Sequence, residues 1–196
     1  MRLILENISR HIDLHKDEVE YFISLLKQRT IRKRQFLLQS GDTSRHETFV
    51  VKGLLRAYTV DKSGYEHVVM FASEGWWISD LYSFLTQTPG SQNIDALEDS
   101  EVLQIEKQDL EKLYIEVPKF DRFFRILLQN AFVANQQRIL ASISQTAEEQ
   151  YMAFVKKYPS LEQRIPQHQV ASYLGITPET ISRIRRNLTK IVNSER

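Results

Sequence analysis

The side chains best suited to binding a polyanion lie close to the C-terminus. The stretch Gln167–Arg186 reads QHQVASYLGITPETISRIRR, and hydroxyl, carboxylate and guanidinium groups recur along its second half. Arginine can donate two hydrogen bonds to guanine, glutamate can accept one from cytosine, and Ser, Thr and Gln suit phosphate oxygens. These are the donors and acceptors of a DNA-contacting surface. The candidate contact residues are Gln167, Thr177, Glu179, Thr180, Ser182, Arg183 and Arg186.

The same stretch has the spacing of a helix-turn-helix, in which two helices cross with little space between them. Ala171 supplies a small residue where the helices touch, and Gly175 supplies a residue that tolerates positive φ in the turn. Thr177 suits the N-cap of the second helix, and Pro178 suits its first position. A helical hairpin with a merely solvated polar face does not require all these features together. The apolar positions of the motif are filled by Val170, Leu174, Ile176, Ile181 and Ile184.

The charge distribution agrees with a local polyanion site. The whole chain of 196 residues carries a formal net charge of +1, whereas residues 165–196 contain five basic and two acidic side chains, a balance of +3. The rest of the chain is therefore mildly acidic at −2. A basic tip on an acidic body favours nucleic acid as the partner of the tip.

The elements before the motif predict a mixed architecture. Residues 3–28 have apolar residues at helical spacing and predict a helix. Between about residues 30 and 105, short apolar runs alternate with turn signals, which is typical of an antiparallel barrel or sandwich. These runs are Phe36–Leu38, Phe49–Val51, Leu54–Val60, Val68–Phe71 and Val102–Ile105.

Helices return after the strand region. Residues 107–115 predict a short helix, and Pro118 marks the start of a helix of about 25 residues whose apolar residues step by three and four. That helix is too long and apolar to serve one small barrel, so we expect part of it to meet a second copy of the chain. The alternative is a helix packed entirely on its own barrel. Residues 147–158 predict a further amphipathic helix, which Pro159 ends.

Residues 8–190 together resemble the Crp/Fnr family of regulators, and the segment Thr177–Arg183 resembles the start of that family's recognition helix. The resemblance implies an α+β fold: an antiparallel, jelly-roll barrel like a cyclic-nucleotide-binding domain in residues 1–117, a dimerisation helix in 118–145, and a DNA-binding helix-turn-helix domain in 146–196. It implies that Glu179 and Arg183 read bases. Pro178 stands where some members carry a further base-reading Arg. Residues 188–196 lack a turn signal, so the family's wing is expected to be short or absent.

The segment Glu74–Leu81 resembles the family's phosphate-binding segment but departs from it. Nucleotide-binding members have Gly-Glu-Leu in place of Ser79-Asp80-Leu81 and Arg-Ser-Ala in place of Gly90-Ser91-Gln92. No Arg or Lys lies between Lys62 and Lys107, and a buried phosphate without a cation is costly. We therefore do not expect cyclic AMP or cyclic GMP. Residues Trp77, Ser79, Asp80, Ser91 and Gln92 remain candidates for the pocket of an unidentified effector, although Trp76 and Trp77 can equally be packing residues.

Other cofactors and activities have little support. The chain has no cysteine, so its own residues cannot ligate an iron–sulfur cluster as in the oxygen-sensing branch of the family. Haem is not expected, because His67 has no evident companion ligand. His11 and His15 are four residues apart, but no third metal ligand accompanies them. No HExxH, GxSxG, P-loop or GxGxxG motif is present, so no catalytic or metal site is expected.

The sequence therefore predicts a regulator rather than an enzyme, acting as a homodimer on a palindromic site. Expected partners are double-stranded DNA, a second copy, RNA polymerase and an unidentified small-molecule effector. No stretch of about 18 apolar residues appears, so no membrane association and a cytoplasmic location are expected. Two rivals remain: a ligand-binding barrel whose helical tail binds protein, and a metal-dependent cupin-type enzyme that would rely on His46 and His67.

Overall fold

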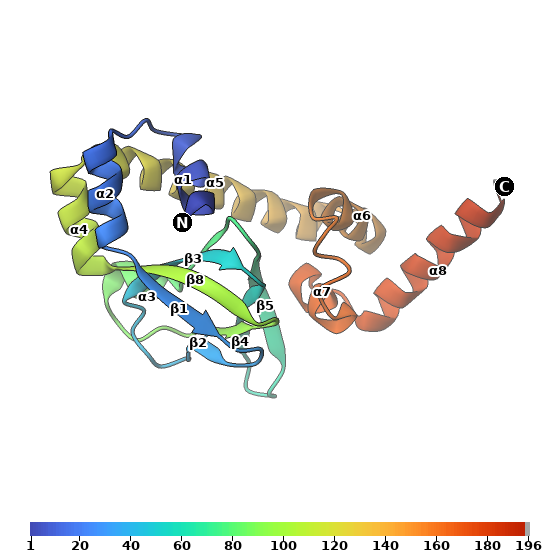
Figure 1. Cartoon of the computed structure of the whole chain (residues 1–196). Helices are drawn as coiled ribbons and strands as arrows, with labels where there is room; N and C mark the ends of the chain where they lie inside the picture. Colours follow the sequence, from blue (N-terminus) through green and yellow to red (C-terminus); the bar gives the residue numbers. More distant parts are fainter. Residues whose placement is uncertain (195–196) are drawn as a thin grey trace. The chain divides into compact units, whose positions relative to one another are not determined.

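The computed structural model describes the backbone of residues 1–194 and the side chains of residues 1–188. The chain forms two compact units. One comprises residues 1–60 with 69–132, and the other comprises residues 61–68 with 133–196. Within the described residues there are eight helices and eight strands (Figure 1). In chain order they are α1 (Arg2–Ser9), α2 (Lys16–Ser24), β1 (Lys27–Ile31), β2 (Phe36–Leu38), β3 (His46–Lys52), β4 (Leu55–Val60), β5 (Glu66–Ala72), β6 (Trp77–Ile78), α3 (Leu81–Thr86), β7 (Asn93–Ala96), β8 (Ser100–Glu106), α4 (Lys107–Glu116), α5 (Lys119–Ser144), α6 (Ala147–Lys157), α7 (Gln167–Leu174) and α8 (Pro178–Ser194).

The strands form two four-stranded sheets, in the orders β1-β8-β3-β6 and β2-β7-β4-β5. The strand pairs with a determined register are antiparallel, for example Thr48 opposite Gln104 and Arg56 opposite Asp95. One cluster of buried apolar side chains takes members from both sheets, so the sheets pack face to face as the sequence predicted. This sandwich core consists of Ile31, Val50, Leu55, Ala57, Ala72, Ile78, Ile94, Ala96 and Val102.

The outer face of the first sheet is covered by helices. Phe49 and Leu103 alternate with the sandwich-core positions of β3 and β8, and they pack instead against α1, α2, α4 and the start of α5 (Figure 1). The aromatic rings of Phe22 and Phe120 stack at 4.7 Å between centroids. The ring of Trp77 lies 5.2 Å from that of Phe124. Strands β3 and β8 of this sheet are therefore buried on both faces.

Several elements differ from the sequence prediction. Residues 3–28 form two helices and a strand, because His15 starts a new helix with a capping box in which the Glu18 side chain accepts from the His15 backbone N–H. β1 escaped prediction because four of its five residues are exposed and polar, with only Ile31 buried. The short elements β6, α3 and β7 were also missed. The predicted long helix is confirmed as α5, which has 26 residues.

A buried ion pair joins the middle of the second sheet. Arg56 Nε donates to Asp95 Oδ1 at 2.8 Å, and a second guanidinium nitrogen donates to Asp95 Oδ2 at 3.1 Å. Both side chains are almost fully buried. The guanidinium also lies 4.0 Å from the centroid of the Tyr58 ring. Two parallel hydrogen bonds between buried charges fix the register of β4 against β7.

We expect Asp95→Ala to lower the free energy of unfolding by about 3–5 kcal/mol, because it leaves the Arg56 charge buried without its carboxylate. Urea unfolding followed by circular dichroism measures the change. Glu6→Ala is the control: Glu6 pairs with Arg2 at 2.6 Å, but the Arg2 side chain is 92% exposed, so the loss should be much smaller. Equal losses in the two variants would contradict the structural role given to the buried pair.

Candidate nucleic-acid interface

Helices α7 and α8 form a tightly packed pair with the predicted turn between them. Gly175 ends α7 with φ +70°, in the left-handed region that glycine adopts without strain. Ala171 is fully buried, as expected for the point where the helices meet. Val170, Ile181 and Ile184 are buried as well, whereas Leu174 and Ile176 are partly buried. The helix-turn-helix geometry that the spacing predicted is therefore present.

The start of α8 is fixed by capping. Thr177 Oγ1 accepts a hydrogen bond from the backbone N–H of Thr180 at 3.2 Å. The Glu179 carboxyl accepts hydrogen bonds from its own backbone N–H and from the Thr177 side chain. These bonds hold the pKa of the Glu179 carboxyl below its ordinary value. Glu179 is thus an exposed carboxylate at the N-terminal end of the second helix. A hydrogen-bond acceptor thus lies at the N-terminal end of α8, the end of a recognition helix that meets base edges in helix-turn-helix proteins.

Gln167 and Ser182 are brought together although they lie on different helices. Gln167 Nε2 donates to the Pro178 carbonyl at 3.0 Å and to Ser182 Oγ at 2.7 Å. Ser182 Oγ in turn donates to the Pro178 carbonyl at 3.1 Å. These bonds tie the first helix to the beginning of the second, so both residues position α8 in addition to being candidate phosphate contacts.

The basic side chains of α8 divide into two groups. Arg183 and Arg186 are exposed and, within the described part of the chain, have no side-chain partner. Arg185 instead forms an ion pair with Glu162, which also accepts from the Tyr151 hydroxyl at 2.9 Å. Burial, and then the bond to Glu162, raises the pKa of Tyr151 to about 12. Arg185 therefore anchors α8 to the rest of its unit, while Arg183 and Arg186 remain available for DNA.

Two further features concern the ends of this region. The Ser172 hydroxyl donates to the Glu66 carbonyl at 2.6 Å and accepts from the Val68 N–H at 2.9 Å, so residues 61–68 attach to α7 within the second unit. No pattern in the sequence indicated this contact. α8 occupies residues 178–194. Within the described part of the chain, it is therefore not followed by the strands of a wing. Glu195 and Arg196 of the predicted basic tip lie outside the described residues, as does the Lys190 side chain.

In the segment that resembles a phosphate-binding site, the Asp80 carboxylate already accepts from the backbone N–H of Gln92. Asp80 is 1% exposed, its Oδ1 accepts from the Ser83 N–H at 3.1 Å, and its Oδ2 accepts from the Gln92 N–H at 3.3 Å. A Cβ atom on Gly90 would stand 2.2 Å from Asp80 Oδ2. A cyclic phosphate here would meet a buried carboxylate instead of a cation. The residues present do not fit a cyclic nucleotide.

Two of the remaining residues of the predicted effector pocket make other contacts. Trp77 packs in the aromatic cluster, and its Nε1 donates to Asn7 Oδ1 at 3.2 Å, which favours the packing interpretation. Ser79 Oγ donates to Glu47 at 2.9 Å. Ser91 is exposed. Of the five candidates, only Asp80 and Gln92 are hydrogen-bonded to each other.

His67 and His11 have local structural partners. His67 Nε2 lies 2.8 Å from Asp61 Oδ2, and the His11 ring lies 5.9 Å from that of Phe123. Within the described residues, no three His, Cys, Asp or Glu side chains are grouped so that they could hold a metal ion. In the same part of the chain, every helix is too short or too polar to cross a bilayer.

Comparisons with known proteins agree with this architecture. Residues 28–116 match the family described as "Cyclic nucleotide-binding domain". The "Anaerobic regulatory protein" of Haemophilus influenzae is 27% identical over 192 residues, covering 91% of this chain and 73% of the relative. "Regulatory protein HlyX" of Actinobacillus pleuropneumoniae is 29% identical over 171 residues, covering 81% of this chain and 70% of the relative.

Solved structures show the same fold. FixK2 from Bradyrhizobium japonicum superposes with a TM-score of 0.74 at 18% identity, covering 84% of this chain and 85% of that one. A CooA mutant from Carboxydothermus hydrogenoformans gives a TM-score of 0.71 at 16% identity and covers 94% and 88% of the two chains. A cyclic-nucleotide-binding-like sandwich with a helix-turn-helix defines a class of transcription regulators rather than enzymes. Within that class, the chain is similar over most of its length to regulators of the Crp/Fnr family.

Glu47, which holds Ser79, makes stability depend on pH. Burial raises the pKa of its carboxyl from 4.5 to about 7, so the folded chain keeps a proton that the unfolded chain releases above about pH 4.5. Stability from this group is complete below pH 4.5 and is lost as pH rises to about 7. We expect Glu47→Gln to remove this loss of stability, which is on the order of 3 kcal/mol in the free energy of unfolding. Urea unfolding at pH 5 and pH 8 measures it.

The exposed Glu20→Gln is the matched control and should leave the difference between pH 5 and pH 8 as it is in the unmodified chain. A Glu47→Gln variant that retains the full difference would show that another group causes it.

Proposed function

We propose that the chain regulates transcription as a homodimer whose two α8 helices enter successive major grooves of a palindromic site, about one helical turn apart. The observation that carries this proposal is the exposed face of α8, where Glu179, Arg183 and Arg186 project from a capped helix that follows a left-handed glycine turn. In this scheme Glu179 and Arg183 read base edges. Gln167, Thr177, Thr180, Ser182 and Arg186 contact the backbone.

The three regions then have separate tasks. Residues 1–117 form a sensor domain, residues 118–145 the dimerisation helix, and residues 146–196 the DNA-binding domain. RNA polymerase is the further partner that the family resemblance implies, and the cytoplasm is the compartment where such a regulator meets DNA. The effector is not a cyclic nucleotide, because Asp80 occupies the backbone donor of the phosphate-binding segment. The chain has no cysteine, so its own residues cannot supply thiolate ligands to an iron–sulfur cluster, and the proposed scheme requires no haem.

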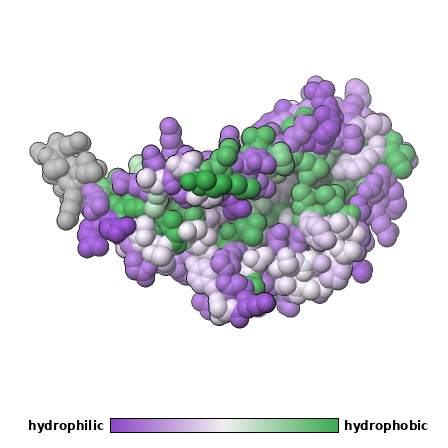
Figure 2. Space-filling view, turned by 180° about the vertical axis from the view of Figure 1, so that it is seen from behind, coloured by the Kyte–Doolittle hydropathy of each residue, from purple (hydrophilic) through white to green (hydrophobic). Residues whose placement is uncertain are grey.

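The exposed apolar side chains of α5 support the dimer. Leu128, Phe132, Ile139 and Ile143 are 41%, 63%, 52% and 78% exposed, although all are large and apolar. Their spacings of four, seven and four residues place them within a sector of about 60° of the helix surface. Such spacing is that of a coiled-coil seam, which buries its stripe against a second helix. Figure 2, which is seen from behind the view of Figure 1, shows apolar side chains exposed among hydrophilic ones.

We expect the double variant Phe132→Asp with Ile139→Asp to be monomeric in sedimentation-velocity experiments at concentrations where the unmodified chain is a dimer. Charges placed in an apolar seam lose hydration without gaining partners. Asn130→Asp is the control: Asn130 is exposed about 160° around the helix from Phe132, so this charge should leave the dimer intact. If the double variant sediments as the unmodified dimer does, the α5 stripe is not the seam.

DNA binding is tested by selection from a randomised duplex pool, followed by fluorescence anisotropy at two salt concentrations. We expect the unmodified chain to enrich a palindrome, and Arg183→Ala to lose about 1–3 kcal/mol of discrimination at one position per half-site. Arg186→Ala should weaken all duplexes about equally and reduce the dependence on salt, because phosphate contacts release counterions. Arg122→Ala, an exposed arginine of α5, is the control and should change neither.

The alternative of a protein-binding tail makes the opposite prediction. A chain that binds no duplex even at low salt, or whose Arg183→Ala variant discriminates as well as the unmodified chain, contradicts base reading by α8. Retained binding of all duplexes without an enriched palindrome would reduce the proposal to non-specific DNA binding.

A further inference from the structure

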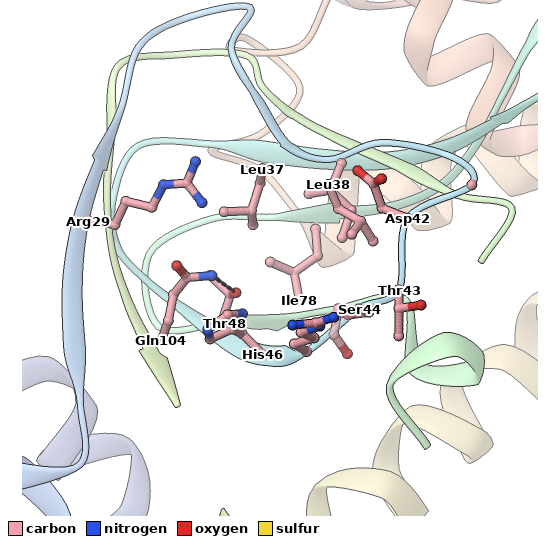
Figure 3. A pocket seen from close by; sticks show the side chains of 14 residues that line it. Arg29, Leu37, Leu38, Asp42, Thr43, Ser44, His46, Thr48, Ile78 and Gln104 are labelled. Atoms are coloured by element: carbon pink, nitrogen blue, oxygen red, sulfur yellow. Dashed lines mark hydrogen bonds between the residues drawn. The ribbon is translucent and has the colours of Figure 1, made fainter. Parts of the chain in front are cut away.

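An open cavity of about 460 Å³ lies in the first unit, at one end of the space between the two sheets (Figure 3). Cavities of this size hold small organic molecules. The cavity shares Ile78 and Ser79 with the segment that resembles a phosphate-binding site. Its other lining residues are Arg29, Leu37, Leu38, Gly41, Asp42, Thr43, Ser44, Arg45, His46, Thr48, Ile94 and Gln104.

The cavity exists because the inward-facing rows of the first sheet change character at this end. On each strand, the residue two positions away from a sandwich-core residue faces the same side but is polar. Arg29 stands in this relation to Ile31, Thr48 to Val50, and Gln104 to Val102. Opposite them, Leu37 and Leu38 of β2 and Ile94 of β7 stay apolar. The cavity thus has one polar wall and one aliphatic wall.

The polar wall offers donors to an anion. Arg29 and Arg45 are exposed at the cavity, and within the described residues neither guanidinium has a hydrogen-bond or ion-pair partner. His46 lies close enough to both arginines for their charges to lower its pKa, although burial is the larger cause and Glu106 acts in the opposite direction. An anion between the two arginines would receive charge-assisted hydrogen bonds that the protein itself does not supply.

Hydrogen-bonding capacity is also left over deeper in the wall. Gln104 Nε2 donates to Thr48 Oγ1 at 3.1 Å, and both side chains are buried (Figure 3). Because Thr48 is the acceptor in that bond, its hydroxyl proton can be donated to a ligand. The Thr48 hydroxyl therefore forms a fixed, oriented donor on the same wall as Arg29.

The far side of the cavity carries the opposite charge. In Figure 3, Arg29 and Asp42 lie on opposite sides of the pair Leu37 and Leu38. The Asp42 side chain is exposed and has no partner among the described residues. A ligand with one anionic end fits this arrangement, whereas a second anionic end would face Asp42.

We propose that this cavity binds a small amphiphilic monocarboxylate, with its carboxylate between Arg29 and Arg45 and its aliphatic body against Leu37, Leu38 and Ile94. The proposal concerns ligand binding alone and does not rest on DNA binding by α8, so the two can fail separately. It assigns the first unit a ligand site that meets the segment resembling a phosphate-binding site only at Ile78 and Ser79, and that does not use the Gln92 N–H to which Asp80 is bonded.

The test is isothermal titration calorimetry of the full chain with octanoate as the probe. We expect one octanoate per chain and an affinity that falls about tenfold or more in the double variant Arg29→Ala with Arg45→Ala. Arg32→Ala is the matched control, because Arg32 is exposed in the loop after β1 but does not line the cavity. The affinity of this variant for octanoate should stay within about twofold of that of the unmodified chain. Circular dichroism checks that each variant is folded.

Three further probes separate the parts of the proposal. 1-Octanol lacks the charge, gluconate replaces the aliphatic body by hydroxyl groups, and octanedioate adds a second carboxylate. All three should bind more weakly than octanoate, and Asp42→Asn should strengthen octanedioate binding more than octanoate binding.

The proposal is overturned if octanoate does not bind, or if the arginine double variant binds it as tightly as the unmodified chain does. Equal binding of 1-octanol would remove the anionic head from the ligand class, and equal binding of gluconate would remove the aliphatic body. The anisotropy assay on the arginine variants reports DNA binding independently, and without ligand we expect it to be unchanged.

Discussion

The alternation of side chains along β3 and β8 is the constraint on which the first unit depends. Every second residue points into the sandwich, where Val50 and Val102 meet the second sheet, and the residues between them point outward to the helices. A shift of register by one residue would exchange the two sets and bury each against the wrong partner. Because both faces of β3 and β8 are covered, the register of these two strands has little freedom. The same alternation sets Thr48 and Gln104 on the inner face at the open end.

The elements that sequence patterns predicted well are those with a strong local signal. The helix-turn-helix could be placed to the residue, because Ala171 and Gly175 answer steric requirements that few other residues meet. Pro118 correctly marked the start of α5. β1 could not be found in this way, since its polar residues are held by pairing with β8 and only Ile31 is buried. Its tertiary position, not its composition, makes it a strand.

The candidate sites show the same division. The predicted face of α8 is exposed as expected for Arg183 and Arg186, yet Gln167 and Ser182 also bind each other, which no spacing rule indicates. The effector pocket was sought in the segment that resembles a phosphate-binding site. The open cavity in the first unit draws on residues far apart in sequence, from Arg29 to Gln104. Convergence of distant residues on one cavity follows from sheet topology and cannot be read along the chain.

The contact between Asp80 and Gly90 couples two departures from nucleotide-binding relatives that look independent in the sequence. Gly90 stands where those relatives carry an arginine, and any side chain at this position would start with a Cβ atom 2.2 Å from Asp80 Oδ2 and 2.9 Å from the Ser83 Cβ. An arginine could therefore not be accommodated while the aspartate keeps its present place. The carboxylate would have to leave the backbone N–H of Gln92 before a cation could enter. A substitution at Gly90 alone would therefore act at two places, because it would also displace the Asp80 carboxylate and free the Gln92 N–H for another acceptor.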